Sequence, residues 1–412
     1  MAKSTSRQSR HLKAVASLDD MSLPAWTYSD PEFFALERQA VFRPSWQVVC
    51  HESDLPKPGD YVTFRLHNER VAVIRGRDGT LRAFHNVCRH RAARLLDGDA
   101  GHCGGRVTCP YHAWSYGLDG RVIALPEADQ YARFYRGQLG RVALDLDVFL
   151  GFVFIRIEGT GPSIADLMAP VADEFALYRA EDLKPLGPIR ERVRAVNWKN
   201  ATDNYIDALH VRAAHPGLNS IIGETYGLHA DGFVSRLAGE ADHMGHAGPT
   251  ARLYCKVLPD VAHLPESHRR LWLYYQVWPN VTFNIYPDMI EFMSFLPLSP
   301  TACMVRDGAY ALPDDRREMR IARYLNFRIN RDVNVEDKDL IERVQDGMGS
   351  SVYTTGPLGS HEVCLRNMAR QMRQVLPVSK LAEPPPPGTV AARNREMSAD
   401  APAGDLRPAP RS

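Results

Sequence analysis

The sequence lacks a long apolar run, an excess of charge of either sign, and enough cysteine for a disulfide scaffold. No apolar stretch approaches the ~18 residues of a membrane-spanning helix, so we expect no membrane partner. The net charge is only +1, which argues against a surface that binds nucleic acid. Seven cysteines in 412 residues are odd in number and too sparse for a disulfide framework. We therefore expect a cytoplasmic protein whose clustered cysteines are metal ligands or catalytic groups.

The two ends of the chain differ in pattern from its middle. Residues 1–22 are polar and lack hydrophobic periodicity, which predicts a flexible leader. A helix should follow within 23–41 and pack on the catalytic domain, with Asp30 as its N-cap and Pro31 at its first position. The proline-rich segment 381–412 should be a disordered tail, because its composition cannot bury a core.

The middle of the chain is predicted to form two domains with different secondary-structure patterns, so we expect an α+β protein. Residues 42–158 alternate short Val, Ile and Phe runs with Asp-Gly turns, which is typical of an all-β domain with hairpins. Residues 159–380 mix strand runs with helical patterns, including two separate helices near 316–330 and 335–348.

The most specific motif is a pair of Cys-x-His-like segments in the β domain. Cys88-Arg89-His90 is followed, after eighteen residues, by Cys109-Pro110-Tyr111-His112. A zinc finger usually pairs Cys with Cys and His with His, whereas each segment here holds one of each. That arrangement suits a Rieske [2Fe–2S] cluster, in which two thiolates hold one iron and two imidazoles hold the other. A structural zinc site is the alternative.

A second motif lies in the other domain, where the run Asn197-Trp198-Lys199 precedes Asp207, His210 and His215. Asp207 and His210 are three residues apart, so they share one face if the helix is continuous. Pro216 disfavours helical backbone at His215, so the helix should end there and the turn can bring His215 back toward His210. Two histidines need one carboxylate to complete the facial triad of a mononuclear iron.

The segments CRHRAARL and CPYHAWSYGLDGR resemble the Rieske block of the large (alpha) subunit of Rieske non-heme iron oxygenases, the aromatic-ring-hydroxylating type. The resemblance covers roughly residues 25–378. It departs at Ala92 and Ala113, where the family often has glycine. It implies a Rieske [2Fe–2S] domain over 42–158 and a helix-grip-like catalytic domain over 159–380, with an antiparallel sheet and helices.

The resemblance also assigns roles within the second site. In the family, the second acid of a pair is the third iron ligand, which maps to Asp337. Glu336 and Asp339 are the alternative ligands. The simplest alternative is that this segment is only a charged, solvated helix face. The acid three residues before the first histidine joins that ligand to a Rieske histidine of a neighbouring subunit. This maps to a catalytic Asp207 that links His210 to His112 of another chain.

The implied function is that of a terminal oxygenase, which uses O₂ and reduces it with electrons from a partner. The chain has no Gly-x-Gly-x-x-Gly between a strand and a helix, so we expect a separate NAD(P)H-dependent flavin and iron–sulfur reductase. The resemblance implies a homotrimer or a multiple of it. A pure Rieske electron carrier would need only residues 42–158 and would have no use for a facial triad.

The substrate class is the most open question. The second motif, the segment GPLGSHE and the form CPYHAW resemble the branch that oxidises choline, glycine betaine and stachydrine. An N-demethylase of this kind would hydroxylate a methyl group, and the product would then lose formaldehyde. Carnitine oxygenases carry Glu where this chain has Asp207, which counts against carnitine. The alternative is a mono- or dioxygenase of an aromatic acid. Candidate cation–π contacts to the substrate come from Tyr205, Trp278, Phe283 and Tyr286.

Overall fold

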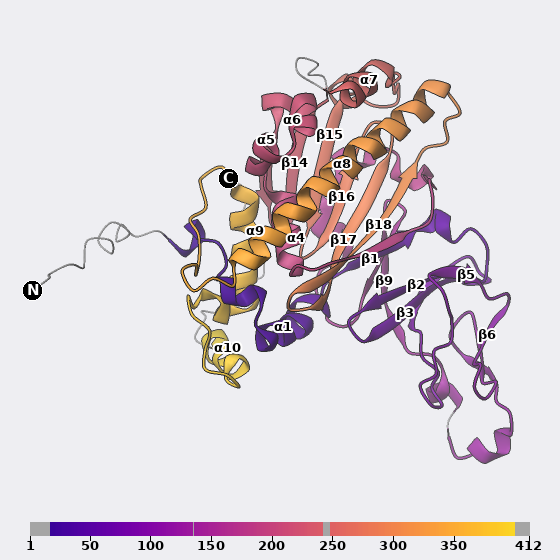
Figure 1. Ribbon diagram of the computed structural model, residues 1–412. Helices are drawn as coiled ribbons and strands as arrows, with labels where there is room; N and C mark the ends of the chain where they lie inside the picture. Colours follow the sequence, from indigo (N-terminus) through magenta and orange to yellow (C-terminus); the bar gives the residue numbers. More distant parts are fainter. Residues whose placement is uncertain (1–16, 135, 242–247, 400–412) are drawn as a thin grey trace, which may run out of the picture.

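The protein has two β-sheet regions joined side by side, with helices gathered on the larger one (Figure 1). The structure is a computed structural model and describes residues 17–134, 136–241 and 248–399. No helix in these three ranges combines the length and hydropathy needed to cross a bilayer.

The N-terminal region contains a seven-stranded antiparallel sheet in the order β1-β10-β9-β4-β3-β2-β5, with a separate three-stranded sheet β6-β7-β8. Asp78-Gly79 lies in the hairpin turn between β3 and β4, as expected for that pair. The strands are β1 Gln47–His51, β2 Asp60–Leu66, β3 Glu69–Arg75, β4 Leu81–His85, β5 Ala100–His102, β6 Arg106–Thr108, β7 Ser115–Gly117, β8 Val122–Ala124, β9 Ala143–Phe149 and β10 Phe152–Arg156.

The C-terminal region is built on an eight-stranded antiparallel sheet in the order β11-β18-β17-β16-β15-β14-β13, with β12 also paired to β18. Together with the helices this is the α+β architecture predicted from sequence. The strands are β11 Lys184–Pro185, β12 Arg190–Arg194, β13 Gly227–Asp231, β14 Val234–Glu240, β15 Leu271–Val277, β16 Val281–Ile285, β17 Ile290–Ser299 and β18 Ala302–Ala311.

Both faces of the larger sheet are covered, so β16 is buried at every residue and β17 is buried over residues 290–297, rather than at alternate positions. One face packs on β10 and the short helices α2 and α3, and the other packs under the remaining helices of this region. The register places Tyr275 opposite Phe283 and Tyr274 opposite Asn284. Because successive side chains point to opposite faces, Tyr275 and Phe283 face the first layer, and Tyr274 and Asn284 face the second.

The helices are mostly short, with one long exception that crosses the strands in Figure 1. They are α1 Pro31–Glu37, α2 Ile164–Met168, α3 Ala172–Ala176, α4 Trp198–Ile206, α5 Leu209–Ala214, α6 Pro216–Ile222, α7 Pro249–Val257, α8 Arg317–Gly347, α9 Val363–Val375 and α10 Val390–Ala399.

Helix α8 is a single helix of 31 residues, so the prediction of two helices near 316–330 and 335–348 was wrong. Its N-terminal half buries an apolar stripe that includes Met319, Ala322 and Ile329 at helical spacing. The stripe stops after Ile329 and resumes at Ile341. The polar interval made the pattern look broken, although the backbone continues through it.

The two ends of the described chain meet, which corrects the prediction that 381–412 is disordered. Helix α10 lies in this segment, and the carboxylate of Glu32 accepts hydrogen bonds from the backbone N–H groups of Gly388 and Val390. The Trp26 indole donates to the Leu381 carbonyl at 2.9 Å. Partners in the N-terminal segment thus order a proline-rich stretch that could not fold alone; residues 400–412 lie outside the described residues.

The N-terminal segment docks on the catalytic region through polar contacts as well as packing. Its α1 begins as predicted, with the Asp30 side chain accepting from the Phe33 N–H at 2.7 Å, but it continues as a π-helix from Arg38 rather than as one α-helix over 23–41. Glu37 and Lys199 form an ion pair of 2.6 Å in which both side chains are fully buried. Residues 18–20 of the predicted leader form a 3₁₀ turn, while 1–16 lie outside the described residues.

Two candidate metal centres and a substrate pocket

The Cys-x-His segments form two loops with the same backbone hydrogen bonds. The Cys88 N–H donates to the Ala93 carbonyl at 2.8 Å, and the Cys109 N–H donates to the Trp114 carbonyl at the same distance. One residue earlier in each loop, Ala92 and Ala113 both have φ of 57°. This left-handed backbone explains why glycine suits these two positions.

The side chains of these loops converge as a cluster site requires. Cys88 and Cys109 are both 3% exposed, and the imidazoles of His90 and His112 are 4.6 Å apart between ring centres. The Nδ1 atom of His90 is buried and has no hydrogen-bond partner in the described structure. An orphaned ring nitrogen beside two buried thiols and a second imidazole fits a Rieske [2Fe–2S] cluster.

Two aromatic residues support this site. The Trp114 ring stacks on His90 with an angle of 6° between the rings, which holds the imidazole plane. The Tyr116 hydroxyl lies 3.2 Å from Cys88 Sγ and accepts from the Arg89 N–H at 3.0 Å. Burial is the main cause that raises the pKa of the Cys88 thiol, so bound iron would be needed to keep it as a thiolate.

The second candidate centre joins α5 to the middle of α8. One ligand atom from each of His210, His215 and Asp337 can be chosen so that the three lie within 4.8 Å of one another. The Asp337 Oδ1 atom is 2.9 Å from His215 Nε2 and 3.5 Å from His210 Nε2. This convergence of two imidazoles and one carboxylate matches the expected facial triad for iron.

The helix between these residues breaks rather than running straight. Asp207 has extended backbone and ends α4. The prediction that Asp207 and His210 share one helix face was therefore wrong. Its carboxylate instead accepts from the Leu209 N–H at 2.8 Å and contacts His210 Nδ1 at 3.0 Å. His215 ends α5 and begins α6, as Pro216 predicted.

Each histidine of the triad is oriented by its own acid. Asp207 holds Nδ1 of His210, and Glu336 holds Nδ1 of His215 at 2.7 Å. Both Nε2 atoms therefore turn toward Asp337, the arrangement in which a carboxylate behind the ring fixes a metal-binding imidazole. Glu336, an alternative third ligand at the sequence level, occupies this supporting position, and Asp339 is exposed and not part of the group.

Charges in this centre are strongly coupled. Burial works against a charge on His210, but hydrogen bonds with Asp207 and Asp337 raise its pKa to about 9. Burial also works against the Asp337 anion, but hydrogen bonds with His210 and His215 lower its pKa to about 2. Burial works against a charge on His215 as well, but hydrogen bonds with Asp337 and Glu336 raise its pKa. A divalent cation bound between the three side chains would replace the protons that they share.

A cavity of about 100 Å³ opens beside the triad. Its aromatic wall consists of Tyr205, Tyr226, Tyr274 and Phe295, and its polar wall includes Asn284, Asn330 and Asn334. The Tyr205 hydroxyl donates to Asn284 Oδ1 at 2.8 Å, which ties this ring to β16. Of the four predicted substrate contacts, only Tyr205 lines this cavity.

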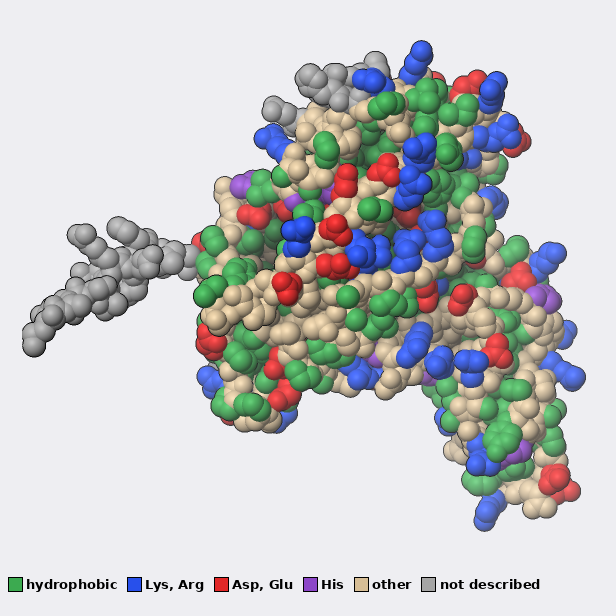
Figure 2. All heavy atoms as spheres, viewed as in Figure 1, with side chains coloured by type: hydrophobic (Ala, Val, Ile, Leu, Met, Phe, Trp, Pro, Cys, Tyr) green, Lys and Arg blue, Asp and Glu red, His purple; other side chains and the backbone are tan. Residues whose placement is uncertain are grey.

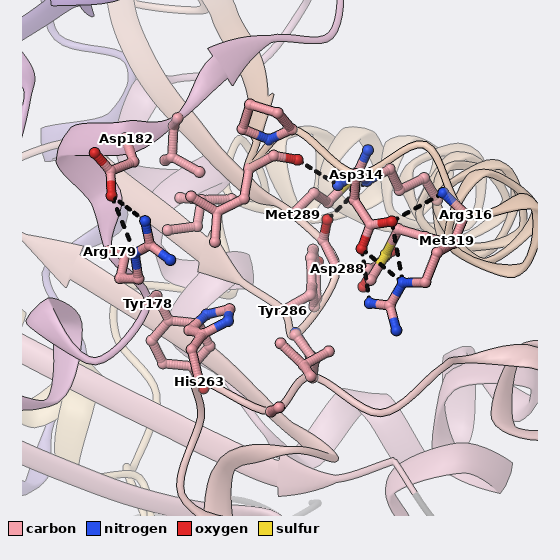
Figure 3. Close-up of a pocket in the computed structure, with 18 residues that line it drawn as sticks. Tyr178, Arg179, Asp182, His263, Tyr286, Asp288, Met289, Asp314, Arg316 and Met319 are labelled. Atoms are coloured by element: carbon pink, nitrogen blue, oxygen red, sulfur yellow. Dashed lines mark hydrogen bonds and ion pairs between the residues drawn. The ribbon is translucent and has the colours of Figure 1, made fainter.

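The other three predicted contacts lie elsewhere. Phe283 is on the opposite face of the sheet and packs on Phe152 at 4.9 Å, and Trp278 is buried in the apolar core without lining the cavity. Tyr286 lines a different cavity of about 270 Å³, drawn in Figure 3. Among the charged residues of that cavity, Arg179 pairs with Asp182 and Arg316 pairs with Asp314, while Arg323 donates hydrogen bonds to backbone carbonyls.

Two signals in the sequence could have identified the missed residues. Alternation along β15 and β16 puts Tyr274 and Asn284 on one face, but only the structure reveals that both faces are buried. On α8, the positions 330, 334, 337 and 341 are spaced for one helix face, and all four line the cavity. The polar residues that interrupt the apolar stripe of α8 therefore line the cavity of the candidate iron site.

Comparisons with known proteins agree with this construction. Residues 45–138 match the Rieske [2Fe-2S] domain family, and residues 177–377 match the ring hydroxylating alpha subunit (catalytic domain) family. The chain is 31% identical over 343 residues to the carnitine monooxygenase oxygenase subunit of Acinetobacter pittii strain PHEA-2, which covers 80% of this chain and 87% of that protein.

Two further relatives extend the comparison. A glycine betaine monooxygenase oxygenase subunit of Chromohalobacter salexigens is 36% identical over 204 residues, 49% of this chain and 45% of that protein. The solved structure of a quaternary ammonium Rieske monooxygenase superposes with a TM-score of 0.74 at 25% identity, covering 87% of this chain and 96% of that one. The chain therefore belongs to the Rieske oxygenases, as an oxygenase subunit whose cofactors are a Rieske [2Fe–2S] cluster and a mononuclear iron.

Proposed function

We propose that this oxygenase hydroxylates an N-methyl group of a small quaternary ammonium substrate. The single observation that carries the proposal is the aromatic wall of the cavity beside the triad, formed by Tyr205, Tyr226, Tyr274 and Phe295. It is supported by likeness to carnitine and glycine betaine monooxygenase subunits.

The wall suits a cation that cannot donate hydrogen bonds. Ring centres of Tyr205 and Tyr274 are 6.3 Å apart, and those of Tyr226 and Tyr274 are 6.1 Å apart. Burial raises the pKa of all three phenols, so the rings stay neutral and present their electron-rich faces. A trimethylammonium group held among such rings gains cation–π attraction without losing a hydrogen-bonded shell.

The reaction needs O₂, two electrons from a reductase and two protons from solvent, and gives an alcohol and water. When bound, the iron would activate O₂ beside the methyl group, while the cavity residues hold the substrate. Hydroxylation of an N-methyl carbon yields a product that releases formaldehyde. We infer an NAD(P)H-dependent flavin and iron–sulfur protein as the reductase, and a cytoplasmic location, which suits seven cysteines that are all free of disulfide bonds.

Asp207 is proposed to connect subunits of a homotrimer. Its side chain is 22% exposed while one oxygen contacts His210, so the carboxylate can also face a neighbour. A bond from there to the neighbouring subunit's His112 would give a short path between the two metal sites. Helix α5 and the exposed loop of the β domain would then lie at an interface.

Substrate screening tests the proposal directly. Glycine betaine, γ-butyrobetaine, carnitine, choline and benzoate would be compared for O₂ uptake coupled to loss of the substrate, with the loaded enzyme and a reductase, and formaldehyde would be measured as the product of N-methyl oxidation. We expect a quaternary ammonium compound to give coupled uptake, and Tyr274→Leu to weaken its binding. Coupled oxidation of benzoate alone would replace the proposal by the aromatic-acid alternative.

The bridging role is tested separately with Asp207→Ala and Asp207→Glu. The alanine variant should keep the cluster spectrum and the mononuclear iron, but oxidation of the reduced cluster by O₂ and substrate should slow by about 10²-fold or more. The glutamate variant should recover part of the rate. Light scattering should give the mass of three chains, and a monomer that turns over at full rate would disprove the inter-subunit path.

A further inference from the structure

A second hollow, of about 710 Å³, runs between β12 and α8 and is rich in positive charge. We call it the arginine groove. Its charged lining comprises one acid, Glu291, and six cations, Arg190, Arg192, Arg194, Arg328, Arg331 and Lys338. Figure 2 shows Lys and Arg side chains gathered beside α8 on this face of the molecule.

Most of these cations already have acidic partners. Arg190 and Arg192 both contact the buried carboxylate of Asp307, Arg331 pairs with Asp332 at 3.0 Å, and Lys338 pairs with Glu342 at 3.0 Å. Two remain. Within the described residues Arg194 and Arg328 form no ion pair, and the buried Nε of Arg328 has no hydrogen-bond partner.

The one acid of the groove does not offset these two cations in full. Burial is the main cause that raises the pKa of Glu291 to about 7, and the nearby Asp307 anion is the second. Below that pH the Glu291 carboxyl is mostly neutral. Its Oε2 accepts from Asn284 Nδ2 at 3.0 Å, and it is 3.8 Å from Arg190. Glu291 is therefore engaged with its neighbours rather than with Arg194 or Arg328.

The groove and the iron cavity share a wall. Arg194, Asn330, Asn334 and Lys338 line both hollows. A ligand that fills the small cavity with one end can thus extend into the groove with the other. Arg194 stands at the boundary between a neutral aromatic wall and a cationic channel.

We propose that the arginine groove binds a carboxylate group of the substrate, anchored by Arg194 and Arg328, while the group to be oxidised lies in the iron cavity. This deepens the proposed function and rests on it for the site of oxidation. It selects betaines, which carry an acid, over choline, which carries an alcohol. It would also fit an aromatic acid.

The chemistry favours a carboxylate for two reasons. A guanidinium offers parallel N–H donors that match the two oxygens of a carboxylate. The contrast with the cavity of Figure 3 is also informative, because Arg179 and Arg316 there are each neutralised by a partner in the same cavity. Unpaired cations beside a reaction cavity raise the local concentration of anions and speed their entry.

The test measures binding without turnover, by calorimetry on the full-length enzyme with its metals and without reductant. The probes are two matched pairs, γ-butyrobetaine with its methyl ester and benzoate with methyl benzoate. At least one acid should bind about tenfold or more tightly than its ester, and Arg194→Gln and Arg328→Gln should each remove most of that preference. Arg194→Lys should keep part of it, and Arg320→Gln, a change at an exposed residue on the same helix as Arg328, should keep all of it.

The outcomes separate this inference from the proposed function. If neither acid binds more tightly than its ester and the arginine variants change no affinity, the groove has no such role, although a quaternary ammonium substrate would stand. If only benzoate shows an arginine-dependent preference, the groove stands and the quaternary ammonium proposal falls. Absence of binding by both acids, or a preference for the acid over its ester that both arginine variants keep, would overturn the carboxylate site.

Discussion

The two metal sites of this chain are organised in opposite ways. The four candidate cluster ligands lie within residues 88–112, on loops whose backbone hydrogen bonds repeat each other. The iron triad instead joins His215 to Asp337, 122 residues away in sequence. Its geometry depends on side-chain hydrogen bonds from Asp207 and Glu336. A site shaped by backbone should tolerate side-chain changes nearby, and a site shaped by side chains should not.

The largest expected effect tests the iron triad at its acid. Asp337→Ala should lower bound iron from about three to about two per chain and abolish turnover, while about two sulfides and the cluster spectrum remain. Iron and acid-labile sulfide analysis measures this. Asp339→Ala, an exposed acid on the same helix, is the matched control and should keep all the iron. Loss of iron in Asp339→Ala rather than in Asp337→Ala would show that Asp339, and not Asp337, is the iron ligand.

A second prediction addresses the acids behind the histidines. Glu336→Gln removes the charge that orients His215, so the affinity for ferrous iron should fall by about 10- to 100-fold. Titration of the iron-depleted enzyme measures the affinity. Glu342→Gln, which changes an acid paired with Lys338 on the same helix, should leave it unchanged. Equal affinities in both variants would show that the triad does not need its supporting acid.

The third prediction concerns the junction of the two regions, where β1 places His51 against the Ala180 carbonyl. Burial lowers the pKa of His51 to about 4, below its unfolded value, so stability is full above pH 6.5 and falls as pH drops toward 4. Between pH 7 and pH 5 its share of the loss should be about 2 kcal/mol. Denaturant titrations should show a smaller pH slope in His51→Gln; equal slopes would contradict the assignment.

The smallest effect tests the cluster loops. Ala92→Gly and Ala113→Gly remove the strain of left-handed backbone and should each stabilise the protein by about 0.5 to 1 kcal/mol, with the cluster spectrum unchanged. The neighbouring Ala93→Gly, where φ is not positive, should destabilise it instead. Thermal melts of the loaded protein compare the three. Stabilisation by Ala93→Gly would remove the backbone explanation.

The same contrast explains how far the sequence alone could lead. Cys88, His90, Cys109 and His112 stand in a short pattern with one chemical meaning, and His210 and His215 are placed by a local turn. Asp337 needed likeness to a family, because no local pattern links it to residues more than a hundred positions earlier. These assignments remain predictions until metal is measured.

Other features depended on partners that no local pattern contains. Phe283 and Tyr274 look equivalent as aromatic residues in strands, and only the covering layers decide which one reaches the cavity. Helix α10 follows a proline run that appeared unable to fold, yet Glu32 near the other end of the chain supplies hydrogen-bond acceptors for it. The polar interval of α8 concealed a continuous helix because its residues line the cavity beside the candidate triad rather than the apolar core.

Because α8 is one continuous helix, it fixes the distance between the residues that it carries. Arg328 and Asp337 stand on one rigid rod, and nine residues of α-helix rise roughly 14 Å. In the binding mode proposed above, the distance along α8, together with the reach of the side chains, would set the span between the bound carboxylate and the carbon that reacts. Inserting a single residue between these positions would rotate one side chain by about 100° about the helix axis relative to the other. We expect such an insertion to change the length of substrate that the enzyme accepts.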